Sequence, residues 1–285
     1  MEEETKEKEL NELQLLKQKA LNRKLTEAQE KILKFMSIAD ATTPEIISIA
    51  TGYAPITITK TYLPELLQYR LVKWWRGEKY TARFKTNILR ITVWGRERTH
   101  TKRKHTGMFK SLWHHILKSE VMAYLFKEHP DWEIGGEGDF KALIRKMKED
   151  KIEETKSKYG DEVADEWWLS KGYGGLPIPD LWQLHNEVLL ATLYECETLS
   201  SLKRLKKKIE KYNKLEGVLR QEEYLELVVV FVTQDEEKKI KLRAELDKHY
   251  NDIKFDYRVE CINRLDLYRH HKKGGRKAKP NNIDD

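Results

Sequence analysis

The sequence predicts an α/β protein with a mainly helical N-terminal domain, and two observations predict it. Between residues 26 and 70, three helical segments follow one another with only short breaks. From residue 111 onward, helical and strand-like segments alternate in the order α-β-β-β-α-β-α-β, with an insertion after the first strand. Such alternation is typical of helices packed on a sheet in an α/β sandwich.

Composition narrows the class of protein. The 285 residues are 39% hydrophobic and 35% charged with a net charge of +7, which fits a polyanionic partner but also an ordinary solvated surface. The two cysteines, Cys196 and Cys261, form no CxxC pair, which argues against a thiolate zinc site and a disulfide-stapled secreted domain. The acidic start and the short longest apolar run, 227–232, predict a cytoplasmic protein with no membrane partner.

Residues 1–25 form the first segment, a charged helix. Leu10, Leu13, Leu16 and Leu21 recur in it at roughly helical spacing. Two interpretations stay open, because a short amphipathic helix of this kind is either frayed in solvent or packed on a neighbour. In the second case the partner is another copy of the chain, which gives a homodimer.

Residues 26–95 contain a helix-turn-helix pattern. Thr26 precedes the first helix, and Thr43-Pro44-Glu45 opens a short second helix that Gly52 ends. A third helix is expected over 55–70. A short helix, a tight turn with glycine and a following helix are the parts of a helix-turn-helix.

Two strand-like runs follow, 71–75 and 79–84, and the residues between them favour a hairpin. With the three helices they make a winged helix, which binds double-stranded DNA by placing its third helix in the major groove. The residues expected to contact DNA are Thr57, Thr59, Lys60, Thr61 and Tyr62 on the helix, and Arg76, Lys79 and Arg83 on the wing. The alternative is a winged helix whose third helix binds a protein.

The rest of the chain divides into a basic linker at 96–110, an α/β domain at 111–262 and a basic tail at 263–285. The expected helices of the α/β domain cover 111–128, 140–158, 161–169, 199–215 and 235–249. The expected strands cover 132–134, 177–184, 187–197, 224–233 and 253–260. The glycine-rich GGEGD at 135–139 is expected to be a loop.

Carboxylates gather at two predicted strands. Asp180 starts one strand, and Glu195 and Glu197 close the next with their side chains on the same face. Converging carboxylates repel one another unless a cation joins them, and Mg²⁺ or Mn²⁺ is the ion that oxygen ligands suit. The next helix adds cations at Lys203, Lys206, Lys207 and Lys208, a surface suited to DNA phosphates.

The distance between these acids depends on the loop that joins the strands. A tight turn at His185-Asn186 sets Asp180 opposite Ala191, because antiparallel residues pair directly across the ladder. A wider loop or a bulge brings Asp180 to Glu195. The sequence leaves both arrangements open.

Asp180 followed by Glu195-Cys196-Glu197 resembles the PD-(D/E)xK nuclease pattern, and the run YECETLSSLKRLKKKIEKY resembles the replication-relaxation family of mobile elements. In the second match Thr198, Ser201, Lys208 and Tyr212 hold the later positions of the motif, and the likeness extends to His115 and Glu137. The resemblance implies a winged helix joined to a nuclease-like domain with a Mg²⁺ or Mn²⁺ site. It implies the metal ligands Asp180, Glu195, Glu197 and Glu120, and the catalytic residues Asp180, Glu195, Glu197 and His115.

One position departs from the nuclease pattern, because Glu197 stands where the lysine is expected. Lys203 or Lys206 on the next helix then replaces that lysine. The leading hypothesis is a DNA-binding protein of a plasmid or virus that nicks or cleaves DNA in replication, relaxation or transfer. The alternative is an inactive nuclease fold that acts as a replication accessory or a transcriptional regulator. A tyrosine nucleophile, from Tyr212, Tyr224 or Tyr257, is a further option.

Overall fold

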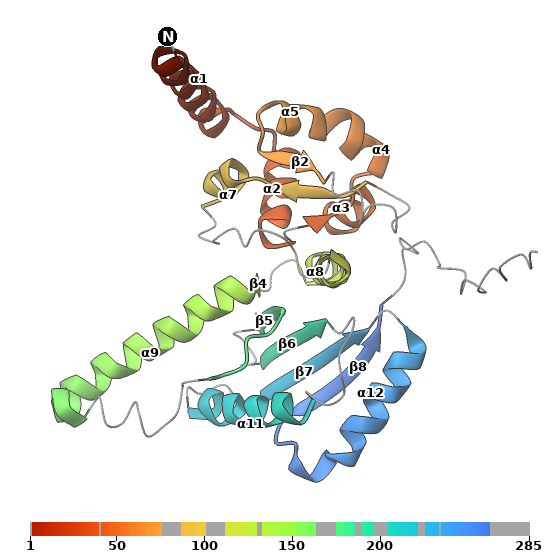
Figure 1. Cartoon of the computed structure of the whole chain (residues 1–285). Helices are drawn as coiled ribbons and strands as arrows, with labels where there is room; N and C mark the ends of the chain where they lie inside the picture. Colours follow the sequence, from red (N-terminus) through yellow and green to blue (C-terminus); the bar gives the residue numbers. More distant parts are fainter. Residues whose placement is uncertain are drawn as a thin grey trace, which may run out of the picture.

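The structure is a computed structural model that describes residues 2–262, except 40, 76–86, 101–111, 130–132, 164–174, 186–189, 197–204, 222–225 and 234. It contains two sheets, each associated with its own helices (Figure 1). The smaller sheet belongs to the N-terminal region and has the order β1-β3-β2. The larger has five strands in the order β4-β5-β6-β7-β8. The expectation of an α/β protein with a helical N-terminal region is confirmed.

The N-terminal region consists of short helices around an antiparallel sheet. Its helices are α1 (Glu2–Asn22), α2 (Glu27–Ala39), α3 (Pro44–Thr51), α4 (Pro55–Thr57), η1 (Ile58–Tyr62), α5 (Leu63–Gln68) and α7 (Val93–Arg98). Its strands are β1 (Ala41–Thr42), β2 (Val72–Trp74) and β3 (Leu89–Ile91). The Thr43 hydroxyl accepts a hydrogen bond from the Ile46 N–H and so caps α3, as the sequence predicts.

The segments α4, η1 and α5 form one continuous helix with a π-helical turn in the middle. Pro64 has no N–H to donate to the preceding turn, and the Leu63 N–H bonds to the Ile58 carbonyl, five residues back. The turn before this helix depends on Gly52, whose φ of 80° is left-handed. The third predicted helix therefore exists, but its central turn is wider than an α-helical one.

The larger sheet is mixed. Strands β4 (Glu133–Gly136), β5 (Leu181–His185) and β6 (Leu190–Cys196) are antiparallel neighbours. Strands β7 (Glu226–Thr233) and β8 (Asp256–Cys261) extend the sheet in parallel to β6. The run of apolar residues in β7 is buried throughout, as expected for a strand covered on both faces.

Helices cover both faces of this sheet. The helices are α8 (Leu112–Glu128), α9 (Glu137–Tyr159), α11 (Leu205–Gln221) and α12 (Glu236–Lys248), with a short turn, η3 (Tyr250–Asp252), before β8. Helix α8 lies between the sheet and the N-terminal helices, and α11 and α12 lie on the opposite face (Figure 1). One hydrophobic core therefore continues from α1 through α8 to β7, and a second fills the space under α11 and α12.

Several expectations from the sequence need correction. Strands β1 and β3 and helix α7 were not predicted, and α7 lies partly in the segment assigned to the linker. The residues assigned to a glycine-rich loop instead end β4 and begin α9, where the Asp139 carboxylate accepts a hydrogen bond from the Gly136 N–H. The predicted strand at 79–84, the short helix at 161–169 beyond Val163, and the basic tail lie outside the described residues.

Candidate functional site

The register of β5 and β6 brings two acidic residues side by side. Leu181 pairs with Tyr194, and the Asp180 N–H bonds to the Tyr194 carbonyl at 3.0 Å. Asp180 thus stands next to Glu195 across the ladder, and a tight turn at His185-Asn186 is wrong because His185 itself pairs with Leu190. The wider of the two connections weighed from the sequence is the one observed.

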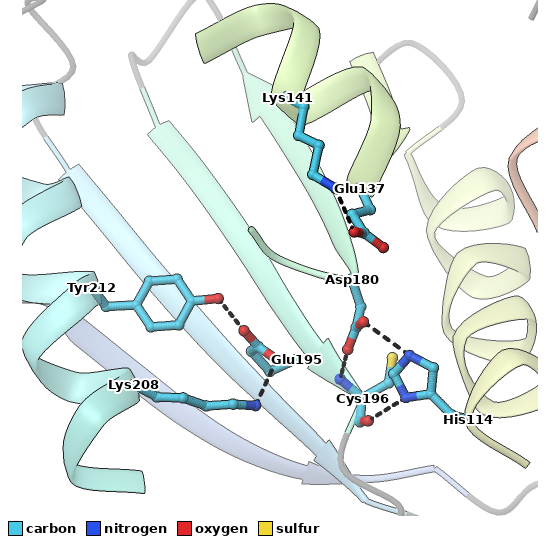
Figure 2. Close-up of polar contacts among 8 residues, drawn as sticks. All are labelled: His114, Glu137, Lys141, Asp180, Glu195, Cys196, Lys208 and Tyr212. Atoms are coloured by element: carbon cyan, nitrogen blue, oxygen red, sulfur yellow. Dashed lines mark hydrogen bonds and ion pairs between the residues drawn. The ribbon is translucent and has the colours of Figure 1, made fainter. Parts of the chain in front are cut away.

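Glu195 is held from the α11 side of the sheet. Its side chain accepts a hydrogen bond from the Tyr212 hydroxyl and forms an ion pair with Lys208, 2.8 Å away (Figure 2). Glu195 is only 7% exposed and Tyr212 is fully buried. Burial raises the pKa of Glu195 to about 7, with Lys208 opposing the rise and Asp180 adding to it. Glu195 therefore gains and loses its proton near neutral pH.

Asp180 is held from the α8 side. One carboxylate oxygen lies 2.9 Å from Nε2 of His114, and the other accepts the Cys196 N–H at 2.8 Å. Nδ1 of His114 lies 2.9 Å from the Cys196 carbonyl oxygen. Both ring nitrogens thus face oxygens that accept hydrogen bonds, and only the charged imidazolium has a proton to donate from each nitrogen. The contacts close a ring that fixes the end of β6 to α8 (Figure 2).

Opposing effects set the pKa values of this pair. Burial lowers the pKa of His114, but the hydrogen bond and the charge of Asp180 outweigh burial, so the pKa is raised. Burial raises the pKa of Asp180, but His114, the Cys196 N–H and the nearby Lys118 outweigh it, so the pKa is lowered. The pair is therefore an imidazolium and a carboxylate over a wide range of pH.

The two carboxylates bind partners on opposite faces of the sheet. Asp180 contacts α8, whereas Glu195 contacts α11, although the register alone sets their Cβ atoms on one face (Figure 2). Each of the four carboxylate oxygens already accepts a hydrogen bond or an ion pair within the protein. The two acids therefore belong to two separate hydrogen-bonded groups, Asp180 with α8 and Glu195 with α11.

In this arrangement both acids meet protein donors at the oxygens that a divalent ion would need. Within the described part of the chain, no three His, Cys, Asp or Glu side chains are grouped closely enough to hold a metal. The Lys208 ammonium occupies the place beside Glu195 where a metal would supply positive charge. Glu197, the third expected ligand, lies outside the described residues, as does Lys203.

The other predicted site residues are distributed differently. His115 is half-buried on α8 with its ring edge-on to His114, and Glu120 is buried further along the same helix. Lys206 and Lys207 are exposed on α11, so Lys208, rather than Lys203 or Lys206, is the lysine that meets Glu195. Glu137 opens α9 and pairs with Lys141 at 2.8 Å (Figure 2).

The histidine that meets Asp180 is His114, rather than the neighbouring His115 chosen from the sequence, and Lys118 was missed. His114 and Lys118 are one turn apart on α8, the spacing that sets both side chains on one face of a helix. Lys118 is 3% exposed and acts electrostatically on both Asp180 and His114. Their four-residue spacing was the available signal, but His114 and His115 are adjacent, and a one-residue error rotates the chosen histidine to another face.

A second candidate site is the outer face of the helix formed by α4, η1 and α5. Thr59, Lys60 and Thr61 are exposed on it, while Thr57 and Tyr62 are half-buried. The Tyr62 ring packs on Tyr53 of the preceding turn with centroids 5.1 Å apart. This face offers hydroxyls and one ammonium to solvent at the π-helical turn. The wing residues Arg76, Lys79 and Arg83 lie outside the described residues.

Comparisons with known proteins add no identity to these two sites. No family model, no curated protein and no solved structure matches the chain. Among the helices of the described residues, none is long and apolar enough to cross a bilayer.

Proposed function

We propose that this chain binds double-stranded DNA through the exposed face of α4–η1–α5, and that its N-terminal region is a winged helix. One observation carries the proposal. A short helix, α3, ends at the left-handed Gly52, and the following helix presents Thr59, Lys60 and Thr61 to solvent. Hydroxyls and a lysine on such a helix suit phosphates and base edges in a major groove.

The surrounding elements support this proposal. The order helix, strand, helix, helix, strand, strand of α2, β1, α3, α4–α5, β2 and β3 is the order in which a helix-turn-helix is followed by a wing. The net charge of +7 favours a polyanionic partner. Thr59, Lys60 and Thr61 follow one another along the chain, and all three are exposed to solvent.

We infer that the sheet region is a nuclease-like domain that serves binding rather than cleavage. The adjacent acids Asp180 and Glu195 at neighbouring strand ends support the likeness to the PD-(D/E)xK pattern. The closed hydrogen bonding of both acids supports loss of the metal-dependent step. The protein then acts as a replication accessory or regulator of a plasmid or virus, and DNA binding does not require Mg²⁺.

Fluorescence anisotropy with a labelled random-sequence duplex tests DNA binding. Lys60→Glu places a carboxylate against the phosphates, and we expect affinity to fall about tenfold or more at moderate salt. Lys146→Glu, on an exposed position of α9, makes the same change in net charge and serves as the matched control. Equal affinities of the two variants would show that the helix face does not contact DNA. EDTA should leave the affinity of the wild-type protein unchanged.

A metal-dependent nuclease remains the second candidate, because Asp180, Glu195 and Lys208 supply the two acids and the lysine that the pattern needs. This activity requires both acids to release their present partners. Supercoiled, duplex and single-stranded DNA are incubated with Mg²⁺ or Mn²⁺ and either the wild-type protein or Glu195→Gln. Cleavage by the wild-type protein alone would establish the nuclease and overturn the binding-only role of the sheet region.

A further inference from the structure

The helix formed by α4, η1 and α5 is packed on the protein by residues that do not follow α-helical spacing. Ile58, Leu63 and Leu66 are each fully buried, and the first two are five residues apart. The π-helical turn between Ile58 and Leu63 accounts for this spacing, because it adds one residue to the turn and keeps both side chains on the inner side. Residues 59–61 of that turn are exposed together as a result.

Ile56, in the first turn of this helix, is an apolar side chain that faces solvent. It stands two residues before the buried Ile58, and two residues rotate by about 200° around an α-helix, so the two side chains point to opposite sides. Ile56 is accordingly 58% exposed. Thr59 and Lys60 follow it by three and four residues, the spacings at which side chains are neighbours on a helix surface. The solvent-facing side of the helix therefore begins with a hydrocarbon group and continues with polar groups.

The start of this helix is the part that a helix-turn-helix brings to the base pairs. In that motif the first residues of the second helix contact base edges in the major groove. Helices α4 and α5 lie on the side of the N-terminal region that is turned away from α8 and the larger sheet (Figure 1). On the proposed DNA-binding function, Ile56 is therefore placed at the base edges.

The major groove offers one methyl group to an alkyl side chain. Base edges there present hydrogen-bond donors and acceptors, and the methyl group is the one at C5 of thymine. An isoleucine against a donor or acceptor removes water from that group without replacing its hydrogen bond, which costs free energy. Against the thymine methyl group, both apolar surfaces leave water together, which is favourable. An exposed isoleucine at this position thus favours thymine over the other bases.

The polar neighbours of Ile56 are less selective. The Thr59 hydroxyl donates its hydrogen to the Pro55 carbonyl at 2.9 Å, so in this arrangement it has no proton for an acceptor on a base. Lys60 ends in a flexible point charge that suits phosphates in any sequence. Among these three side chains, Ile56 is the one whose chemistry distinguishes one base from the others.

We propose that Ile56 makes DNA binding by this protein selective for duplexes that present a thymine methyl group in the major groove. The proposal rests on the proposed DNA-binding function and names the base that the helix recognises. Lys60 supplies affinity that depends little on sequence, whereas Ile56 supplies a discrimination of about fourfold for each methyl group that it contacts, as expected for burial of one methyl-sized group.

Replacement of thymine by uracil tests the contact, because the two bases differ only in the C5 methyl group. A duplex that binds the full chain is enriched from a randomised pool and prepared in two forms, one with thymine and one with uracil at every thymine position. In competition anisotropy the wild-type protein should bind the thymine form about fourfold more tightly. Ile56→Ala should bind the two forms equally. Circular dichroism checks that the variant is folded, as expected for a change at an exposed position.

Val93→Ala is the matched control, because Val93 of α7 is also 58% exposed and lies outside the helix α4–η1–α5. This variant should keep the wild-type preference for thymine. An enriched duplex without thymine, equal wild-type affinities for the two forms, or a preference that survives in Ile56→Ala would each overturn the role of Ile56.

Lys60→Glu in the same assay separates this inference from the proposed function. If Lys60→Glu weakens binding more than Lys146→Glu but the wild-type protein shows no preference for thymine, DNA binding by the helix stands and base recognition by Ile56 is wrong. If Lys60→Glu and Lys146→Glu bind equally well, the proposed function is itself contradicted, and the role of Ile56 is contradicted with it.

Discussion

The helix face of α4–η1–α5 and the acid cluster at the ends of β5 and β6 are both rich in polar side chains, but the two groups differ in their exposure to solvent and in their hydrogen bonding. Thr59, Lys60 and Thr61 are exposed to solvent. Asp180 and Glu195 are mostly buried, and every carboxylate oxygen accepts a proton donor of the same chain. The first region faces solvent, although the Thr59 hydroxyl donates a hydrogen bond to the Pro55 carbonyl, whereas the acids of the second region use their acceptor oxygens within the fold.

Acids at neighbouring strand ends are therefore not sufficient evidence for a metal site. Each acid forms an ion pair with a neighbouring helix: Asp180 with His114 of α8, and Glu195 with Lys208 of α11. Substitutions in the cluster should therefore change stability more than DNA binding, and substitutions on the helix face should do the reverse.

The largest effect is expected in the pH dependence of stability. The folded pKa of Glu195 is about 7 and its unfolded value is near 4.5, so the folded state binds this proton more tightly. The free energy of unfolding should then fall as pH rises from about 4.5 to 7, by on the order of 3 kcal/mol. His114 acts in the same direction at higher pH, since its raised pKa stabilises the fold below 6.5 and this stabilisation is lost above it.

Urea unfolding at a series of pH values measures this dependence, and variants assign it. Glu195→Gln should remove most of the slope between pH 4.5 and 7, whereas His114→Gln should remove the part above 6.5. Asp180 has the opposite sign, because its lowered pKa stabilises the fold above its ordinary value near 3.8 and fails only at more acidic pH. A slope that survives in Glu195→Gln would mean that Glu195 is ionised throughout and that the cluster is not closed as described.

The second prediction concerns Lys208, the lysine that pairs with Glu195 in this cluster. Lys208→Met keeps the apolar stem but leaves a buried carboxylate with Tyr212 as its remaining described donor, at a cost of about 2 kcal/mol in the free energy of unfolding. The cost should be larger at pH 8 than at pH 5, where Glu195 is protonated. Lys206→Met, at an exposed position on the same helix, is the control. An equal loss at both pH values would contradict an ionic role.

The fold was largely predictable from the sequence because long periodic segments determine it. The apolar run of β7 and the helical signals of α2, α8 and α12 needed only their own residues. Strands β1 and β3 could not be found in this way, since two or three residues have no periodicity and Leu89–Ile91 becomes a strand only by pairing between β1 and β2. Tertiary pairing, and not local propensity, defines these elements.

The acids Asp180 and Glu195 were found as candidates from the sequence, but their partners were not. The register between β5 and β6 depends on the length of the connection at 186–189, and no residue in the sequence indicates that length. The choice between His114 and His115 depends on the rotation of α8, and α8 is buried on two sides, so its apolar residues do not mark one face. Which lysine meets Glu195 depends on the number of residues between the end of β6 and the start of α11. That number is defined only in the folded protein.

The smallest effect is expected from Lys207, which the sequence assigns to DNA together with Lys208. Lys207 is exposed on α11, across the larger sheet from α8 and the N-terminal helices (Figure 1). A duplex seated on α4–η1–α5 meets the opposite side of the protein, so Lys207→Glu should weaken binding by less than about twofold, through long-range electrostatics alone. The measurement is anisotropy against the same duplex, with Lys60→Glu as the reference. Comparable losses in the two variants would mean that DNA also follows α11, because a screened charge at that distance cannot match a direct phosphate contact.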